Sequence, residues 1–388
     1  MHGEALVDMK LEAGDSAPLS RPLPPPYYWD AKLFEQEKRN VFAKCWRYAG
    51  HQTELPNPGD YMTMKVADES IFIMRGKDGQ LRAFHNVCQH RAAELLQGRG
   101  TVKNFVTCPY HAWSYDHTGC LRAAINSENV AGFDKSNYSL SPVRLEVWLG
   151  FVFVNLDPQA EPLSVAGAEL EALMRRFCPE IDRMKLVDRV EYAVKCNWKT
   201  VVDNFIESYH LSLSGPAHKA FTDLVDCKDF KVTTHPGGCF YKYFWSSHFA
   251  PAGPNKNAAY DYEDGRKLGN NNDFLSIHMF PDIGFVLFPG ADMLVAFMLP
   301  PEGPEATAEI MAYYTIDGSI DEDTKKGINY FSYVLGPEDN DLVERVQRGL
   351  RSKGYRNGVL MVDRNHTGLS EHAVQRFHEQ VRALVDQG

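Results

Sequence analysis

The sequence predicts an α+β protein in which a small all-β domain precedes a larger domain built on an antiparallel sheet flanked by helices. Three observations lead to this fold class: the chain length, a change of hydrophobic pattern near residue 160, and the order of the elements after it. At 388 residues and roughly 150 residues per domain, the chain has room for two to three domains. Its 44% hydrophobic and 24% charged residues are typical of a globular protein.

The first two segments are predicted from turn residues and from the period of the apolar positions. Residues 1–40 are expected to form an N-terminal arm and an entry helix, because prolines between 22 and 26 disfavour helix and Asp30 then precedes a helical pattern. Residues 41–160 contain short apolar or alternating runs separated by turns, which predicts the small all-β domain. The boundary is expected just after Asp157-Pro158.

The third segment, residues 161–388, mixes strands and helices. Its predicted strands are residues 189–196, 229–235, 239–245, 284–288, 293–299 and 309–316. Its predicted helices are residues 166–177, 198–210, 337–351 and 371–386. This order favours an antiparallel sheet flanked by helices.

Composition excludes two classes of partner. The net charge is −10, with 41 Lys and Arg against 51 Asp and Glu and no long basic run, so nucleic acid is not expected to bind. The most apolar stretch, residues 284–299, contains Pro289, Gly290 and Asp292, which would interrupt a membrane-spanning helix. The N-terminus has no apolar signal segment, so the cytoplasm is the expected compartment.

Two Cys/His pairs stand close together in the predicted β domain. Cys88-Gln-His90 and Cys108-Pro-Tyr-His111 are separated by the seventeen residues 91–107, and each follows a short β-run. With eight cysteines and fourteen histidines in the chain, chance would place both pairs in fewer than about one such sequence in ten. Two thiolates and two imidazoles can hold either a tetrahedral zinc or a two-iron, two-sulfur cluster, and the residues alone leave both open.

A second group of candidate ligands lies in the third segment. If residues 198–210 form a helix, Asp203, Glu207 and His210 share one face, and the break at Gly215-Pro216 lets His218 return toward His210. Two histidines and one carboxylate form the facial triad of non-haem Fe(II) proteins that react with O₂. The carboxylate is expected from the acids that begin the helix at 337–351, and the residues alone leave open which of them it is. Those acids would also stabilise the helix N-terminus without any metal.

The two groups together resemble a known family. The pattern C-x-H-R with C-x-x-H-x-W resembles the Rieske iron–sulfur domain, and Asp203-Asn204-x-x-Glu207-x-Tyr209-His210 followed by His218 resembles the iron segment of Rieske non-haem iron oxygenase catalytic (alpha) subunits. The resemblance implies a Rieske domain and a helix-grip-like catalytic domain. It also implies a set of metal ligands: Cys88, His90, Cys108 and His111 for a [2Fe-2S] cluster, and His210, His218 and Asp339 for Fe(II). By the same resemblance, Asp341 is a less favoured carboxylate than Asp339.

Further roles follow from the same resemblance. Subunits of this kind form head-to-tail homotrimers, in which one subunit's cluster faces the neighbour's iron and an acid, here Glu207, bridges His210 and the neighbour's equivalent of His111. Asp203 and Asn204 are expected to orient the helix or contact the bound ligand. One departure is that seven residues separate His210 and His218, where the family commonly has four or five. A looped insertion would absorb the difference.

The expected activity is oxygenation of a small molecule with O₂ and electrons that a flavin or iron–sulfur reductase takes from NAD(P)H. Residues 218–235 and 369–378 look most like the branch acting on choline, carnitine and betaines, so N-demethylation or monooxygenation of a quaternary amine with formaldehyde release is the leading interpretation. The expected pocket residues are Phe205, Tyr209, Tyr243 and Trp245, which would attract a cation. They would equally line a pocket for an aromatic ring, so a ring-hydroxylating oxygenase is the alternative. A second alternative is a Rieske electron carrier or a zinc-stabilised binding protein.

Overall fold

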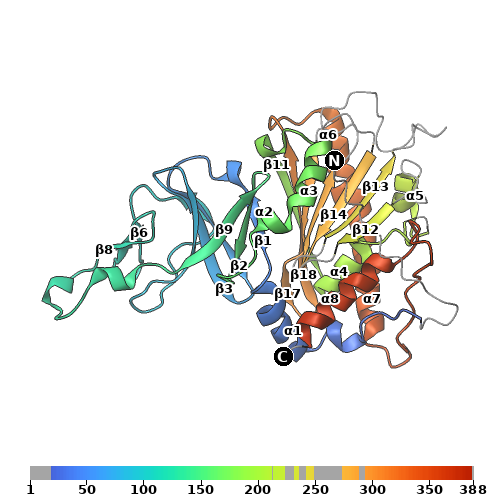
Figure 1. The fold of residues 1–388 in the computed structure, drawn as a ribbon, viewed down its shortest axis with the longest axis horizontal. Coiled ribbons are helices and arrows are strands. Elements are labelled where there is room, and N and C mark those ends of the chain that lie inside the picture. Colours follow the sequence, from blue (N-terminus) through green and yellow to red (C-terminus); the bar gives the residue numbers. More distant parts are fainter. Residues whose placement is uncertain are drawn as a thin grey trace, which may run out of the picture. The chain divides into compact units, whose positions relative to one another are not determined.

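The computed structural model describes residues 19–211, 213–222, 231–235, 242–248, 273–287 and 293–386 (Figure 1). The chain divides into two compact units. The β unit comprises Glu35–Leu186 with Thr315–Gly318, and the α+β unit comprises the rest. The β unit includes residues 161–186, which the sequence placed in the later domain, and the boundary at residue 160 stays a prediction.

A seven-stranded sheet forms the body of the β unit. In spatial order its strands are β1 (Arg47–His51), β10 (Phe151–Asn155), β9 (Pro142–Trp148), β4 (Leu81–His85), β3 (Glu69–Arg75), β2 (Asp60–Val66) and β5 (Arg99–Thr101). Neighbouring strands pair antiparallel. A second sheet is made of β6 (Val106–Thr107), β7 (Ser114–Tyr115) and β8 (Leu121–Ala123). The predicted all-β segment is therefore confirmed.

Short helical segments complete the β unit. They are η2 (Lys38–Phe42), η3 (Gln52–Glu54), η4 (Ser127–Asn129), η5 (Lys135–Tyr138), α2 (Leu163–Ala166), α3 (Ala168–Phe177) and η6 (Ile181–Arg183). Helix α1 (Ala31–Glu37) begins in the α+β unit and ends in the β unit. The side chain of Asp30 begins α1, because its Oδ1 accepts hydrogen bonds from the backbone N–H groups of Lys32 (2.8 Å) and Leu33 (3.2 Å). This is the predicted N-cap.

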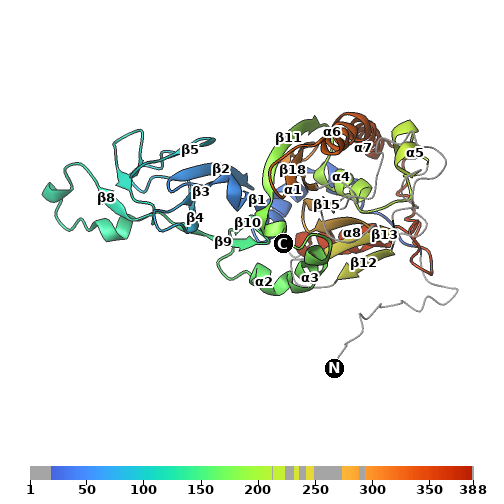
Figure 2. The same ribbon diagram turned by 90° about the horizontal axis from the view of Figure 1, so that it is seen from above.

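An eight-stranded antiparallel sheet forms the centre of the α+β unit (Figure 2). In spatial order its strands are β11 (Lys185–Val194), β18 (Ala306–Thr315), β16 (Leu294–Met298), β15 (Ile283–Leu287), β14 (Asp273–Met279), β13 (Lys242–His248) and β12 (Lys231–His235), with β17 (Pro301–Gly303) paired to β18. The sequence did not predict β14 or β17. The fold class itself, an antiparallel sheet with flanking helices, is confirmed.

Helices pack against this sheet. They are η1 (Pro25–Tyr28), α4 (Trp198–Phe205), α5 (Pro216–Thr222), α6 (Glu322–Tyr330), η8 (Phe331–Leu335), α7 (Gly336–Leu350) and α8 (His372–Val385). One apolar cluster joins Val295 of β16 and Met311 of β18 to Phe221 of α5, Ile328 of α6 and Leu335 of η8. The cluster holds α5, α6 and η8 over one face of the sheet.

The helix predicted at 198–210 is shorter than expected, and this is a correction. It ends at Phe205, so Glu207 and His210 follow the helix instead of sharing its face with Asp203. The reason is local: the carboxylate of Glu207 accepts hydrogen bonds from the backbone N–H groups of Tyr209 and His210, which closes a turn in place of further helix.

The N-terminal segment that the structure describes packs on its own unit. Backbone N of Leu23 donates to Nδ1 of His378 on α8 (3.2 Å), and the backbone carbonyl of Tyr28 accepts from the side chain of Gln347 on α7 (3.0 Å). Leu23 is completely buried. Over the described ranges, the structure contains no helix long and apolar enough to cross a bilayer.

Candidate functional site

Two loops of similar conformation carry the Cys/His pairs of the β unit. The carbonyl of Cys88 accepts a hydrogen bond from the N–H of Ala92, and the carbonyl of Cys108 accepts one from Ala112, both at 3.1 Å. Ala92 and Ala112 have φ of 56° and 55°, in the left-handed region that non-glycine residues rarely occupy. Each loop therefore turns back tightly after its cysteine.

The loops bring the four predicted ligand residues together. Cys88 and Cys108 are 1% and 3% exposed, and the imidazoles of His90 and His111 lie 4.7 Å apart. The ring of His90 stacks on Trp113 at 4.8 Å with 8° between planes. Trp113, from the predicted C-x-x-H-x-W pattern, thus supports one histidine from behind.

The electrostatics of these loops fit a metal group held by thiolate and imidazole. Burial alone would raise the pKa of Cys108, but the backbone N–H groups of His111 and Tyr110 point at its sulfur and lower that pKa overall. Burial, with His90 and Arg91 nearby, lowers the pKa of His111, which keeps its imidazole neutral. Nδ1 of His111 is buried with no hydrogen-bond partner among the described residues. A metal would satisfy that nitrogen.

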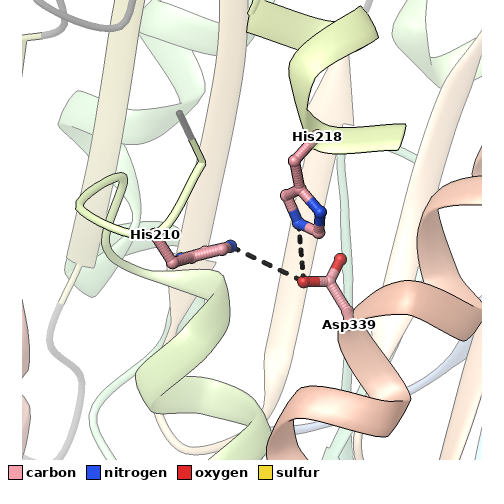
Figure 3. Close-up of side chains that lie close together, drawn as sticks. All are labelled: His210, His218 and Asp339. Carbon is pink, nitrogen blue, oxygen red and sulfur yellow. Dashed lines mark hydrogen bonds and ion pairs between the residues drawn. The ribbon is translucent and has the colours of Figure 1, made fainter. Parts of the chain in front are cut away.

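The second group converges from three segments of the α+β unit (Figure 3). Nε2 of His218 lies 2.9 Å and Nε2 of His210 lies 3.5 Å from Oδ1 of Asp339. One ligand atom from each residue lies within 4.8 Å of the other two. This arrangement can hold one metal ion on one side and leave further coordination positions open, as in a facial triad.

Glu207 sets the orientation of His210. One carboxylate oxygen of Glu207 contacts Nδ1 of His210, and the other accepts the backbone N–H of His210 at 3.1 Å. With Nδ1 engaged, Nε2 of His210 is directed toward Asp339. A carboxylate behind a ligating histidine fixes the ring tautomer and raises its basicity.

Glu338 does the same for His218. Its carboxylate contacts Nδ1 of His218 and accepts the backbone N–H groups of Ala217 (3.2 Å) and His218 (3.1 Å) at the start of α5. Gly215 permits this approach, because a Cβ there would lie 2.6 Å from the Glu338 carboxylate. The turn before α5 absorbs the long spacing between His210 and His218.

The acids at the start of α7 therefore have separate positions. Glu338 holds His218 and Asp339 faces both histidines, whereas Asp341 is exposed and pairs with Arg345 at 2.6 Å. Asp341, the less favoured candidate, points away from the group. Neighbouring acids on one helix thus divide between orienting a histidine and facing the metal space.

The charges of this group favour a cation. Burial lowers the pKa of His210, but the carboxylates of Glu207 and Asp339 outweigh burial and raise it to about 10. Burial raises the pKa of Asp339, but its hydrogen bonds to the two histidines lower it to about 2. Carboxylates concentrated around two imidazoles are the electrostatic environment of a divalent metal.

The remaining predicted residues fall in different places. Asn204 Nδ2 lies 3.3 Å from His210 Nε2, so its amide stands beside the metal space. Asp203 does not lie beside the metal space. Its carboxylate accepts a hydrogen bond from the Tyr28 hydroxyl (2.7 Å) and lies 2.8 Å from His378 Nε2. Asp203 therefore ties α4 to the N-terminal segment and α8.

A pocket lies beside the metal space and is lined by side chains of His210 and Asp339. Phe205, one of the residues expected in the substrate pocket, lines it and stacks on Phe297 at 5.1 Å. Tyr209 is 40% exposed and does not line it. Tyr243 and Trp245 lie on β13, and their side chains fall outside the described residues. Further lining residues that the sequence did not single out are Phe221, Phe297, Glu309, Phe331 and Asn340.

Of these, Glu309 had a signal in the sequence. It is an acid at the start of the predicted strand 309–316, and strand alternation places it on the face of Met311 and Tyr313. An acid on an apolar strand face is a strong departure from the pattern. The aromatic residues had no such signal, because their pocket forms from separate strands and helices.

Two family models match the chain. The ring-hydroxylating alpha subunit catalytic domain matches residues 181–387, and the Rieske [2Fe-2S] domain matches residues 45–134. The first match covers the His210, His218 and Asp339 group, and the second covers both Cys/His loops. The chain is therefore an oxidoreductase with a Rieske [2Fe-2S] domain and a non-haem iron catalytic domain.

The chain is also similar to characterised proteins. It is 38% identical to the carnitine monooxygenase oxygenase subunit of Escherichia coli K12, over 92% of this chain and 91% of that protein. A glycine betaine monooxygenase oxygenase subunit of Pseudomonas aeruginosa is 34% identical over 50% of this chain and 44% of that protein. The alpha subunit of a 2-aminobenzenesulfonate 2,3-dioxygenase of Alcaligenes is 32% identical over 66% of this chain and 65% of that protein.

The fold of the chain is also similar to that of a solved structure. The crystal structure of a quaternary ammonium Rieske monooxygenase with the substrate γ-butyrobetaine matches with a TM-score of 0.80 and 34% identity, over 94% of this chain and 96% of that one. Both domains and their order along the chain are thus shared with an enzyme of known structure. The chain belongs to the Rieske non-haem iron oxygenases, as a catalytic alpha subunit.

Proposed function

We propose that the chain hydroxylates a carbon next to the nitrogen of a small quaternary amine, such as a betaine or a carnitine-like compound. The observation that carries this proposal is the 38% identity to a carnitine monooxygenase oxygenase subunit over 92% of the chain. The pocket supports it, because the rings of Phe205 and Phe297 line a space beside His210 and Asp339. Aromatic faces attract quaternary ammonium groups by cation–π interaction.

Two metal centres follow from the proposal. Their ligands are Cys88 and Cys108 on one iron and His90 and His111 on the other iron of the cluster, and His210, His218 and Asp339 on the mononuclear Fe(II). When bound, the mononuclear iron supplies the O₂ chemistry that attack on an unactivated C–H bond requires. The protein side chains hold the metals, orient the substrate and exclude water.

Glu207 is proposed to connect electron delivery with this site. Its carboxylate holds His210 from behind, and the residue is 9% exposed. We place the neighbouring subunit's equivalent of His111 against it in a homotrimer, as the family resemblance implies. A carboxylate between two imidazoles fixes both rings and couples proton position at one to the charge at the other. A reductase that draws on NAD(P)H supplies the electrons.

The finer proposal is N-demethylation. An N-methyl group, O₂, two electrons and two protons give an N-hydroxymethyl group and water. The hydroxymethyl ammonium then loses formaldehyde and a proton and leaves a tertiary amine. Hydroxylation of the methylene on the other side of the nitrogen would instead break the longer chain, releasing trimethylamine and an aldehyde.

A single turnover tests the proposal. Reduced protein with both metals is mixed anaerobically with one compound from a panel of betaines, carnitine, choline and aromatic acids, and O₂ is then added. Formaldehyde from a betaine is the expected result. Release of trimethylamine would support the same substrate class but would place the hydroxylation on the methylene carbon instead of a methyl group. No oxidation of any quaternary amine would refute the proposal.

The alternative function is ring hydroxylation of an aromatic compound. It is favoured by the 32% identity to the alpha subunit of an aromatic dioxygenase, and Phe205 and Phe297 would stack on a substrate ring. A hydroxylated aromatic acid in the same assay would select it. The electron carrier and zinc-binding alternatives are set aside, because the catalytic domain model matches residues 181–387.

A further inference from the structure

The pocket beside His210 and Asp339 contains a carboxyl group to which the proposed metal chemistry gives no role, that of Glu309. Glu309 lies on β18, a strand inside the sheet, and is 2% exposed. Alternate residues of a strand share a face, so Glu309 lies on the same face as Met311, which also lines the pocket. Its carboxyl group is therefore part of the pocket wall.

The surroundings of Glu309 are apolar or anionic. Its polar partner is the amide of Asn340. Its titratable neighbours are Asp339 on α7, Tyr313 on the same strand, Tyr192 on β11 and Cys196 just after β11. Among the described residues that line the pocket, none is lysine or arginine. His210 also lines the pocket, but a histidine that binds a metal is neutral. In the metal-bound protein, therefore, no described side chain of this wall supplies a positive charge to a Glu309 carboxylate.

The charge of a metal is matched without Glu309. A divalent ion held by His210, His218 and Asp339 is surrounded by three carboxylates, those of Asp339, of Glu207 behind His210 and of Glu338 behind His218. A buried carboxylate with no cation is strongly disfavoured, so an acid in this position stays protonated until a cation arrives. Burial, with a smaller contribution from Asp339, accordingly raises the pKa of Glu309 to about 8.

We infer that Glu309 is the counter-charge for the quaternary nitrogen of the substrate and decides which end of the substrate enters the pocket. A quaternary ammonium group has no N–H to donate, so a protein recognises it by charge and by aromatic faces. Glu309 provides the charge, and Phe205 and Phe297 provide the faces. A carboxylate end would instead meet Glu309 and Asp339 and be repelled. The inference rests on the proposed function and adds a specificity-determining residue to it.

The test compares two ligands of one shape. γ-Butyrobetaine and its carbon analogue 5,5-dimethylhexanoate differ in having a charged nitrogen or a neutral carbon. Their dissociation constants are measured by anaerobic calorimetry on the protein with both metals. Wild type is expected to prefer the betaine at least tenfold, and Glu309→Gln to weaken betaine binding about tenfold or more while changing the analogue less than twofold.

Two further variants separate charge from shape. Glu309→Asp keeps the charge and should keep part of the preference, and Glu302→Gln makes the same amide change at an exposed position of β17 and should change nothing. Betaine binding should also release a proton near pH 7 in wild type, seen as a buffer-dependent binding enthalpy, and release none in Glu309→Gln.

The outcomes separate this inference from the proposed function. If Glu309→Gln weakens both ligands equally, or leaves the preference intact while wild type oxidises quaternary amines, Glu309 only shapes the pocket and the inference is overturned. If wild type neither prefers the cation nor oxidises any quaternary amine, the proposed function fails and the inference fails with it. Equal iron content in all variants ensures that the comparison reports on the pocket.

Discussion

The two groups of candidate metal ligands are built in different ways. In the β unit, Cys88, His90, Cys108 and His111 come from two short loops of nearly the same conformation, close together in the sequence. In the α+β unit, His218 and Asp339 are 121 positions apart and meet through a sheet and several helices. A local motif can therefore specify the first group, whereas the second depends on packing across the whole unit.

The supports behind the ligands differ as well. In the β unit, backbone N–H groups face the Cys108 sulfur and Trp113 stacks on His90. In the α+β unit, each histidine is held by its own carboxylate, Glu207 for His210 and Glu338 for His218. The first group is stabilised by backbone geometry and stacking, and the second by buried charge, which makes the second more sensitive to substitution and to pH.

The strongest test of this comparison removes one group at a time. His210→Ala should lose the mononuclear iron and all measurable turnover, at least a hundredfold, while keeping the visible spectrum and acid-labile sulfide of the cluster. Cys88→Ser should lose the cluster and keep the histidine–carboxylate group. Iron and sulfide content with absorption spectra distinguish the two. Loss of both metals in either variant would show that the units do not hold them independently.

A smaller effect is expected at Glu207. Glu207→Gln keeps a hydrogen bond to His210 but loses the charge, so both metals should remain while turnover falls about 10- to 100-fold. Steady-state rates and metal content check this. Glu191→Gln, the same change at an exposed site of β11, is the control. Full activity of Glu207→Gln would remove its proposed role in electron delivery.

The two groups should also differ in pH dependence. In the metal-free protein the pKa of His210 is raised to about 10, so iron must displace a proton at every pH below that value. Burial lowers the pKa of His218, but Asp339 and Glu338 outweigh burial and raise it, so iron displaces protons from both histidines. Iron affinity should therefore rise at least about tenfold per pH unit between pH 6 and 8. Anaerobic Fe(II) titration measures it, and a flat profile would contradict the prediction. The pKa of His111 is lowered, so this imidazole adds no such slope at the cluster.

The smallest effect is expected behind His218. Glu338→Gln weakens the contact with Nδ1 and the two backbone N–H groups of α5, so iron affinity should fall about tenfold. Asp341→Asn, three residues further along α7 and exposed, should leave iron affinity unchanged. Equal iron binding by Glu338→Gln and wild type would mean that helix packing alone positions His218.

Much of the fold could be predicted from the spacing of the apolar residues and from the residues that form turns and cap helices. The apolar alternation of the β unit, the N-cap Asp30 and helices α7 and α8 were all predicted within a few residues, because local chemistry determines them. The end of α4 could not be predicted, because it depends on the Glu207 carboxylate, which accepts backbone N–H groups in place of helical hydrogen bonds. Strand β14 was missed although residues 275–279 alternate apolar and polar side chains, a pattern that favours a strand.

The candidate sites divide in the same way. The sequence alone determined the family, the two Cys/His loops and the identity of the histidines, because these are chemical types at short, fixed spacing. The family resemblance already named Asp339 as the third ligand. Only the tertiary structure decided that Glu338 orients His218 and that Glu309 enters the pocket wall. The physical reason is that burial and charge pairing arise between segments far apart in the chain, where spacing along the sequence carries no information about distance.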